Sequence, residues 1–173
     1  HTHFFTRAGL LRAVNGLSFV VEQGEVVGLV GESGCGKTVS ALSILGLVDP
    51  PGRVVHGEIV FAGRDLRALD KESLRQVRGK EIAMIFQNPL AALNPVFTIG
   101  RQLTESLRAH GTASGAKAVD RAIELLDLVG ISDPCQRLGQ YPHQFSGGMA
   151  QRVMIAMALT CQPKLLIADE PTT

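Results

Sequence analysis

Residues 31–38 read Gly-Glu-Ser-Gly-Cys-Gly-Lys-Thr, and this glycine-rich loop limits the possible folds more than any other feature of the chain. It follows the apolar run Val26–Val30 and precedes a helical pattern over residues 37–47. A strand, a loop of the form G-x-x-x-x-G-K-[ST] and a helix, in this order, predict a phosphate-binding site, because the glycines let backbone N–H groups turn toward phosphate oxygens. We expect Lys37 to reach the β and γ phosphates and Thr38 to bind magnesium.

Strands and helices alternate along the chain, which indicates an α/β fold. The apolar patterns predict strands at Val14–Val21, Val26–Val30, Glu58–Phe61, Ile82–Phe86 and Leu165–Ala168. Helices are predicted over residues 37–47, over Ile99–Ala109, and from Gly147 to a point before Pro163. A further amphipathic helix, ending at Gly130, is predicted from the helical spacing of Val119, Ile123, Leu126 and Val129.

Composition excludes several classes of protein. The 173 residues carry 17 basic and 16 acidic side chains, so the net charge of +1 argues against a polybasic nucleic-acid module. No apolar run approaches the roughly 18 to 20 residues of a membrane span, the longest being the short Val153–Cys161, and nothing at the start resembles a signal peptide. Three widely spaced cysteines favour a reducing compartment.

An acidic pair follows the last predicted strand. Asp169 and Glu170 come directly after Leu165–Ala168, and open α/β sheets place their chemistry at the carboxyl ends of strands. With a phosphate loop earlier in the chain, we expect Asp169 to hold magnesium through water and Glu170 to polarise the attacking water.

A second anion-binding helix start is predicted at residues 145–152, Phe-Ser-Gly-Gly-Met-Ala-Gln-Arg. Ser146 offers a hydroxyl, and Gly147 and Gly148 expose backbone N–H groups at the positive end of the following helix. This segment resembles the signature sequence of ATP-binding-cassette (ABC) ATPases, whose usual form is LSGGQ. Met149 in place of Gln is similar to the form seen in peptide-importer cassettes.

The order of the motifs strengthens this resemblance. Residues 85–89, Ile-Phe-Gln-Asn-Pro, resemble the Q-loop of the same family, in which the residue matching Gln87 senses magnesium and attacking water. Further stretches are similar to the cassettes of dipeptide and oligopeptide importers and their nickel and glutathione relatives: residues 28–34, 83–89, 93–95, 141–149 and 151–159. Among these, the chain resembles the dipeptide-importer subunit in particular.

The resemblance implies a fold and a domain organisation. The fold is expected to be a P-loop NTPase core, which is a RecA-like mixed sheet flanked by helices, with an N-terminal antiparallel β part and an inserted α-helical subdomain. Residues 1–87 and 162–173 would form the nucleotide-binding core, and residues 88–161 the helical subdomain. The acidic pair Asp169 and Glu170 with its preceding strand resembles the Walker B motif of this family. Because the chain opens on His1 without Met and stops just after Glu170, we expect it to be a partial cassette, cut after this Walker B motif.

The resemblance also implies the site. Glu170, Lys37 and Gln87 are the expected catalytic residues, and Thr38, Gln87 and Asp169 the expected magnesium ligands, with ATP and Mg²⁺ as the bound groups. The expected nucleotide contacts are Gly31, Glu32, Ser33, Gly34, Cys35, Gly36, Lys37, Thr38, Val39, Gln87 and Asp169, together with Ser146, Gly147, Gly148 and Met149 acting on a partner's nucleotide. Phe4 and Phe5 are alternative candidates for the aromatic contact to adenine.

The expected partners are a second, homologous cassette in a head-to-tail dimer, two transmembrane permeases and, indirectly, an extracytoplasmic solute-binding protein, with no nucleic acid. The expected location is the cytoplasmic face of the bacterial inner membrane. Two alternatives stay open: a fragment that binds nucleotide without turnover, and a soluble ABC-type ATPase of DNA repair, although the latter carries a long coiled-coil insertion that is not seen between Gln87 and Ser146.

Overall fold

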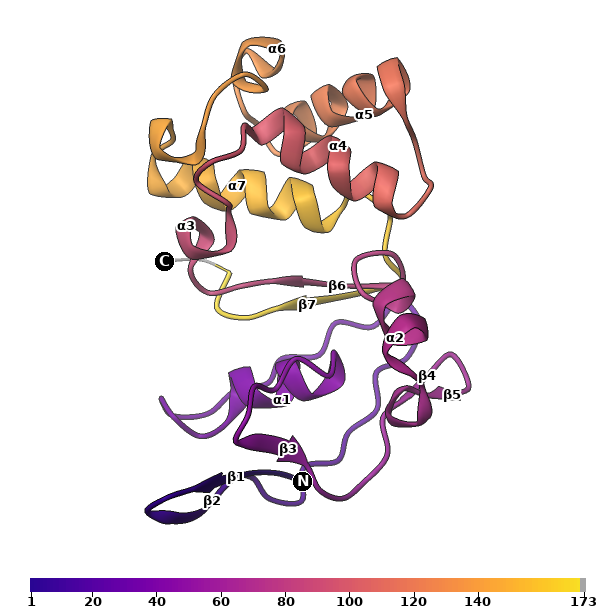
Figure 1. Ribbon diagram of the computed structural model, residues 1–173, viewed down its shortest axis with the longest axis vertical. Helices are drawn as coiled ribbons and strands as arrows, with labels where there is room; N and C mark the ends of the chain where they lie inside the picture. Colours follow the sequence, from indigo (N-terminus) through magenta and orange to yellow (C-terminus); the bar gives the residue numbers. More distant parts are fainter. Residues whose placement is uncertain (172–173) are drawn as a thin grey trace. The chain divides into compact units, whose positions relative to one another are not determined.

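The computed structural model describes residues 1–171, and the chain divides into two compact units, His1–Leu74 and Arg75–Thr173 (Figure 1). Helix α2 (Lys71–Val77) runs across the boundary between them in sequence. Each unit has its own β structure, and the larger helices belong to the second unit. No helix among residues 1–171 is both long enough and apolar enough to cross a membrane.

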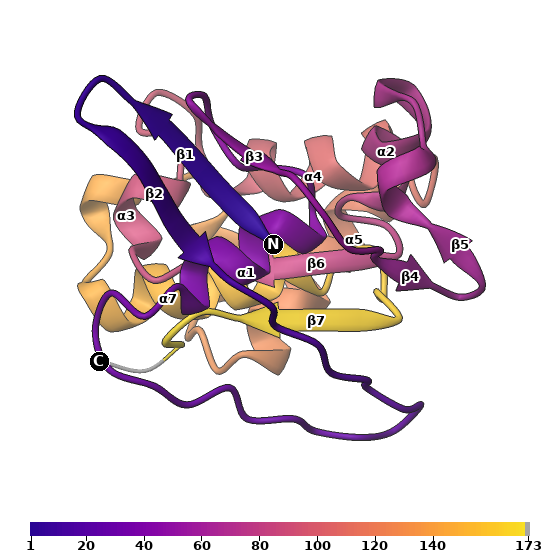
Figure 2. The ribbon, with the colours of Figure 1, turned by 90° about the horizontal axis from the view of Figure 1, so that it is seen from below.

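The first unit begins with a three-stranded antiparallel sheet in the order β2-β1-β3 (Figure 2). Strand β1 (Thr2–Thr6) forms a hairpin with β2 (Gly9–Val14) and pairs on its other edge with β3 (Gly52–Val54). A Cβ on Gly52 would lie 2.6 Å from the Phe4 ring, so the ring packs directly on the backbone of β3. This sheet is the antiparallel N-terminal part that the sequence predicts.

Helix α1 (Lys37–Ile44) follows the glycine-rich loop and is tied to this sheet. The buried hydroxyls of Thr2 and Ser43 lie 2.7 Å apart, which joins β1 to the last turn of α1. Gly46, with φ of 60°, ends the helix, so it stops slightly before the predicted residue 47.

A small hairpin completes the first unit. Strands β4 (Val60–Phe61) and β5 (Arg64–Asp65) are joined by two residues, Ala62 and Gly63, that both have positive φ. This is the geometry of a type I′ turn, whose twist matches that of the flanking strands. The 3₁₀ helix η1 (Leu66–Ala68) follows, and the Asp65 carboxylate accepts the Arg67 N–H at its start.

The strands predicted at Val14–Val21 and Val26–Val30 are wrong: β2 ends at Val14, and residues 15–36 are drawn without arrows (Figure 2). Val26 and Val30 are 97% and 94% exposed. An apolar run indicates which surface requires cover, but a strand exists only where a neighbour completes its backbone hydrogen bonds. Within residues 1–171, no strand pairs with this segment.

The second unit contains strands β6 (Ile82–Ile85) and β7 (Leu165–Ala168) where the sequence predicts strands, and the structure pairs them in parallel. Every residue of β6 is buried. At the start of the pair, the Lys164 ammonium lies 3.4 Å from the Glu81 carboxylate, and at its end the Asp169 N–H donates to the Ile85 carbonyl at 2.9 Å. Because the strands are parallel, the residues after both carboxyl ends lie side by side.

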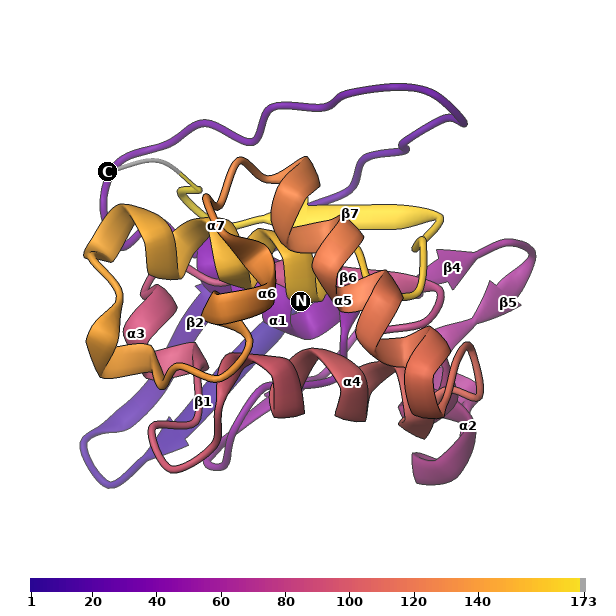
Figure 3. The same cartoon turned by 90° about the horizontal axis from the view of Figure 1, so that it is seen from above.

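Helices connect β6 to β7 (Figure 3). They are, in order, α3 (Pro89–Ala92), α4 (Ile99–Ala109), α5 (Gly115–Leu128), α6 (Pro134–Arg137), η2 (Pro142–Gln144) and α7 (Gly147–Ala158). Leu103 of α4, Leu125 of α5 and Val153 of α7 are fully buried in one hydrophobic core. The predicted helices at Ile99–Ala109 and after Ser146 are confirmed.

The predicted apolar face of α5 is partly wrong. Its buried residues are Ala118, Ala122, Leu125 and Leu126, whereas Val119 is 42% exposed. Small alanines let neighbouring helix backbones approach closely, so they occupy the contact line although they contribute little to a hydrophobic pattern. The predicted end of the helix is confirmed, since Gly130 follows it with φ of 74°.

Candidate functional site

The glycine-rich loop has a backbone that its glycines make possible. Gly34 and Gly36 have φ of 83° and 95°, in the left-handed region that L side chains rarely adopt. A Cβ on Gly36 would lie 2.3 Å from the carbonyl oxygen of Ala13. The loop also turns tightly at Cys35, whose N–H donates to the Glu32 carbonyl at 3.2 Å.

The Lys37 ammonium lies over this loop. Its Nζ donates to the carbonyl oxygens of Gly31 at 2.8 Å and Glu32 at 3.0 Å. Among the described residues, no side chain caps the N-terminus of α1. The loop therefore presents a cation and the positive end of a helix together, which is the arrangement that attracts phosphate oxygens.

A cysteine thiol belongs to the same loop. Cys35 is exposed, and its Sγ lies 2.5 Å from the position that a Cβ on Gly31 would take. Gly31 therefore leaves room for the thiol.

The carboxyl ends of β6 and β7 bring the second group of predicted residues together. Gln87 Nε2 donates to Glu170 Oε2 at 2.6 Å, across 83 positions of sequence. Asp169 is buried, with 7% of its surface exposed, while Glu170 is exposed and has φ of 48°. The sequence predicts all three residues, but not that the Gln87 amide holds the Glu170 carboxylate directly.

The predicted signature segment starts helix α7. Ser146 is the N-cap, and its Oγ accepts the Met149 N–H at 3.4 Å. A Cβ built on Gly147 or Gly148 meets nothing within 4 Å among the described residues. Packing within residues 1–171 therefore gives no reason for glycine at either position.

The predicted site residues are divided between the two units. Residues 31–39 belong to the first unit, and Gln87, the Ser146–Met149 segment, Asp169 and Glu170 to the second. The structure brings Gln87, Asp169 and Glu170 together at one pair of strand ends. The candidate aromatic residues differ: Phe4 packs on Gly52, whereas the Phe5 ring has the Arg53 guanidinium 4.3 Å from its centroid.

The predicted magnesium ligands have suitable chemistry. Thr38, Gln87 and Asp169 offer hydroxyl, amide and carboxylate oxygens, which are the ligands that Mg²⁺ prefers. Among residues 1–171, no three His, Cys, Asp or Glu side chains are placed to hold a metal by themselves.

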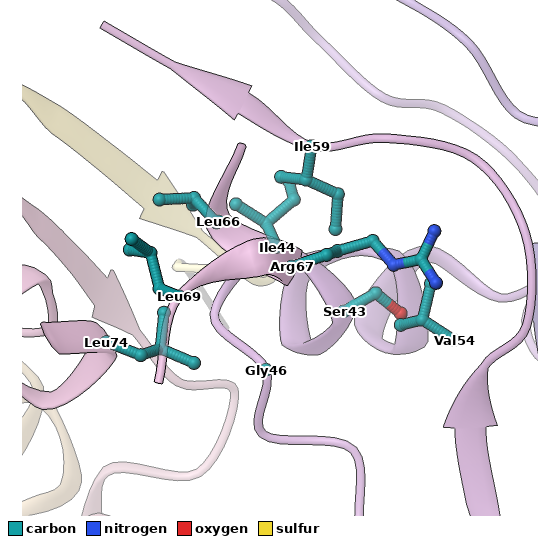
Figure 4. Close-up of a pocket in the computed structure, with 9 residues that line it drawn as sticks. All are labelled: Ser43, Ile44, Gly46, Val54, Ile59, Leu66, Arg67, Leu69 and Leu74. Carbon is teal, nitrogen blue, oxygen red and sulfur yellow. The ribbon is translucent and has the colours of Figure 1, made fainter. Parts of the chain in front are cut away.

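The first unit also contains a cavity of about 290 Å³ that is separate from the predicted residues (Figure 4). The Arg67 guanidinium donates to the Gly57 carbonyl at its edge. None of its lining residues belongs to the glycine-rich loop: they are Ser43, Ile44, Gly46, Val54, Ile59, Leu66, Arg67, Leu69 and Leu74.

Sequence reasoning misses two residues that organise the second unit. Gln102 is buried, accepts the Asn94 N–H at 2.9 Å, and donates to the carbonyls of Asn94 and Phe97 at 3.0 Å. The sequence feature that could have identified Gln102 is a polar residue among the core positions of α4. Gly100 is the second residue of α4. A glycine inside a helical pattern indicates a close packing contact, and this could have identified Gly100 from the sequence.

The chain is similar to known proteins over nearly its whole length. A family model described as "ABC transporter" matches residues 14–173. The chain is 54% identical over 173 residues to a probable peptide ABC transporter ATP-binding protein, y4tR, of Sinorhizobium fredii (strain NBRC 101917 / NGR234), covering 99% of this chain and 52% of that protein. It is 54% identical over 171 residues to the dipeptide transport ATP-binding protein DppD of Escherichia coli (strain K12), with 99% and 52% covered.

The structure is similar to a solved cassette. The dimeric ATP-binding cassette MJ0796, in a post-hydrolysis state bound to ADP and Pi, superposes with a TM-score of 0.86 at 28% identity, covering 98% of this chain and 71% of that one. The chain spans about half the length of the curated relatives it matches.

Proposed function

The chain belongs to the ABC transporter family, and from that premise we propose that it binds and hydrolyses ATP as part of the ATPase subunit of a bacterial importer for dipeptides or oligopeptides. The support for peptide transport is that relatives with 54% identity over 99% of the chain are named peptide and dipeptide transport ATP-binding proteins. The single observation that carries the ATPase proposal is the pairing of Gln87 with Glu170 at the ends of β6 and β7.

Nucleotide binding is assigned to the glycine-rich loop. Lys37 exchanges its bonds with the Gly31 and Glu32 carbonyls for bonds to the β and γ phosphates, while the start of α1 attracts their negative charge. The loop residues named above, from Gly31 to Val39, surround the phosphates. The left-handed glycines preorganise this cradle, so little ordering is required when nucleotide binds.

Hydrolysis is assigned to the acidic pair. Glu170 accepts a hydrogen bond from the attacking water and orients it, and Gln87 sets the direction of the Glu170 carboxylate. Thr38, Gln87 and Asp169 would hold Mg²⁺. When bound, the ion supplies positive charge that offsets the charge on the phosphate oxygens.

The subunit is proposed to act in a head-to-tail pair with a homologous cassette. Ser146, Gly147, Gly148 and Met149 then close over the partner's nucleotide, which accounts for the open space beside both glycines. The similar solved cassette is itself dimeric. In this assembly, residues 1–87 and 162–173 form the nucleotide-binding core and residues 88–161 the inserted helical subdomain.

The pair is proposed to work at the cytoplasmic face of the bacterial inner membrane with two permeases and, through them, a solute-binding protein. The names of the relatives support transport. No part of the proposal requires nucleic acid, in agreement with the net charge of +1.

The test compares Glu170→Gln with the unsubstituted protein in the full-length subunit assembled with its companion cassette. Glutamine has nearly the same shape but accepts the water proton poorly, so ATP binding should persist while turnover falls by about 100-fold or more. Glu105→Gln, at an exposed position of α4, is the control. Normal hydrolysis by the Glu170→Gln assembly would show that the base is assigned wrongly.

A further inference from the structure

The N-terminus of α4 donates its hydrogen bonds to the segment that precedes the signature. The Ile99 N–H donates to the Gln140 carbonyl at 2.8 Å, and the Gly100 N–H donates to the Leu138 carbonyl at 2.9 Å. We call these two bonds the α4 clasp. The next N–H, of Arg101, is bonded to the Thr98 hydroxyl at 3.3 Å. The N–H groups of the first three residues of α4, which have no partner within the helix, are thus all accounted for, two of them by the clasp.

Glycine at position 100 is required by this contact. A Cβ there would lie 2.9 Å from the Leu138 carbonyl oxygen and 3.0 Å from the Leu138 Cβ. Inside a helix, glycine is less stable than alanine by about 1 kcal/mol, so its presence needs a packing reason. The backbone of residue 138 supplies that reason.

Both segments that meet at the clasp are held by hydrogen bonds and burial of their own. On the Gln87 side, Asn88 caps α3, Leu93 is buried, and the Gln102 amide holds the backbone of Asn94 and Phe97 by three hydrogen bonds.

On the signature side, Tyr141 and Gln144 are joined by reciprocal bonds of 2.8 and 2.9 Å. Phe145 is 6% exposed and packs in the helical core directly before Ser146. A displacement at either end therefore has few ways to be absorbed before it reaches the clasp.

We propose that Gly100 is a positioning residue for the hydrolytic reaction, because the α4 clasp makes the Q-loop segment and the signature segment move as one body. This inference rests on the proposed function. Its consequence is that the state of Gln87 in one cassette's own site sets the position of the Ser146–Met149 segment, which serves the partner's site. Gly100 touches no nucleotide and acts through Leu138.

The test uses the full-length subunit assembled with its companion cassette, with one of the two hydrolytic sites silenced. When this chain carries Glu170→Gln, only the companion's phosphate loop turns over ATP, with this chain's signature closing on it. Adding Gly100→Ala should lower that remaining turnover by about tenfold, since small misplacements of catalytic groups have effects of this order or larger.

In the reverse arrangement, the phosphate-loop lysine of the companion is replaced and this chain keeps Glu170. Gly100→Ala should then leave turnover within about twofold, because this site uses the companion's signature. Gly139→Ala is the matched control in both arrangements: its Cβ would lie 3.7 Å from the Gln136 carbonyl, an ordinary contact. A merely structural role of Gly100 would impair both sites equally, and that result, or no effect on either site, would overturn the proposal.

Hydrogen exchange on the unsubstituted assembly decides the matter if Gly100→Ala fails to fold. Peptides covering residues 96–103 and 136–148 should change protection together when Mg-ATP is added, and independent changes would overturn the proposal. ATP hydrolysis by the unsubstituted assembly tests the proposed function separately, so failure of one proposal is distinguishable from failure of the other.

Discussion

Glycine stands at four positions of the proposed machinery in two different physical settings. Gly36 and Gly100 are held by their own fold, because an added Cβ would lie 2.3 Å from the Ala13 carbonyl in one case and 2.9 Å from the Leu138 carbonyl in the other. Beside Gly147 and Gly148, no atom of the described part of the chain lies within 4 Å of an added Cβ. The sequence identifies all four as glycine but does not separate the two kinds, since the distinction depends on what lies within a few ångströms.

Single residues carry most of what the sequence predicts about the site. Lys37, Asp169 and Glu170 are recognised from their motifs, and the structure places the last two at the end of β7 as predicted. The contact between Gln87 and Glu170 was not predictable, because it depends on the register of β6 against β7, in which Ile85 lies opposite Ala168.

The exposed Cys35 thiol offers a direct report on the phosphate loop. Phosphates bound in the loop should cover this side chain. At a Mg-ATP concentration of ten times the Kd, only about one loop in ten is unoccupied, so alkylation of Cys35 by iodoacetamide should be about tenfold slower. The measurement is mass spectrometry of labelled peptides. Cys135, exposed on α6, is the internal control and should label at the same rate with and without nucleotide. Equal labelling of Cys35 in both conditions would contradict phosphate binding at this loop.

At the scale of helices and strands, prediction succeeds where local chemistry decides. Helix α4 begins behind Thr98, which caps it, and α7 begins behind Ser146, so the predicted starts agree with the structure. Prediction fails where the structure depends on which other element packs against a segment. The apolar run Val26–Val30 forms no strand, and α5 buries Ala118 and Ala122 instead of Val119. A hydrophobic pattern indicates which residues favour burial, but it does not indicate which element they pack against.

A histidine at the end of α4 links that helix to the turn before β6. His110 Nε2 lies 3.0 Å from the position that a Cβ on Gly79 would take, and its Nδ1 is buried without a hydrogen-bond partner among the described residues. Burial lowers the pKa of His110 below its ordinary value of 6.5, and the positive charges of Lys80 and Arg75 lower it further.

The lowered pKa of His110 makes stability depend on pH in one direction. Above the ordinary value both the folded and the unfolded chain have a neutral imidazole, so the contribution is constant; below it the unfolded chain takes up the proton more readily and the free energy of unfolding decreases. We expect the Tm of the unsubstituted protein to fall more steeply from about pH 7.5 to about pH 5 than that of His110→Gln. The control is His143→Gln, at an exposed position. Parallel curves for the unsubstituted protein and His110→Gln would contradict this account.

At the scale of the whole molecule, the α/β class, the antiparallel N-terminal part and the positions of strands β6 and β7 agree with the sequence prediction, whereas the parallel pairing of β6 with β7 is a finding of the structure. Both halves of the proposed nucleotide site come from segments far apart in sequence, Lys37 from the first unit and Glu170 from the second. Local pattern identifies each half, and the family resemblance is what relates them. The α4 clasp lay outside such reasoning, since it joins two backbones whose side chains carry no motif.

The central claim is that this molecule binds Mg-ATP through its glycine-rich loop, and calorimetric titration tests it most directly. The full-length protein that carries this chain is compared with Lys37→Ala and with Lys117→Ala, an exposed lysine of α5 as control. Loss of a charged hydrogen bond to phosphate, about 1.5 to 3 kcal/mol, predicts roughly 10- to 100-fold weaker binding for Lys37→Ala and no change for Lys117→Ala. Equal affinity for ATP in all three proteins would contradict the account.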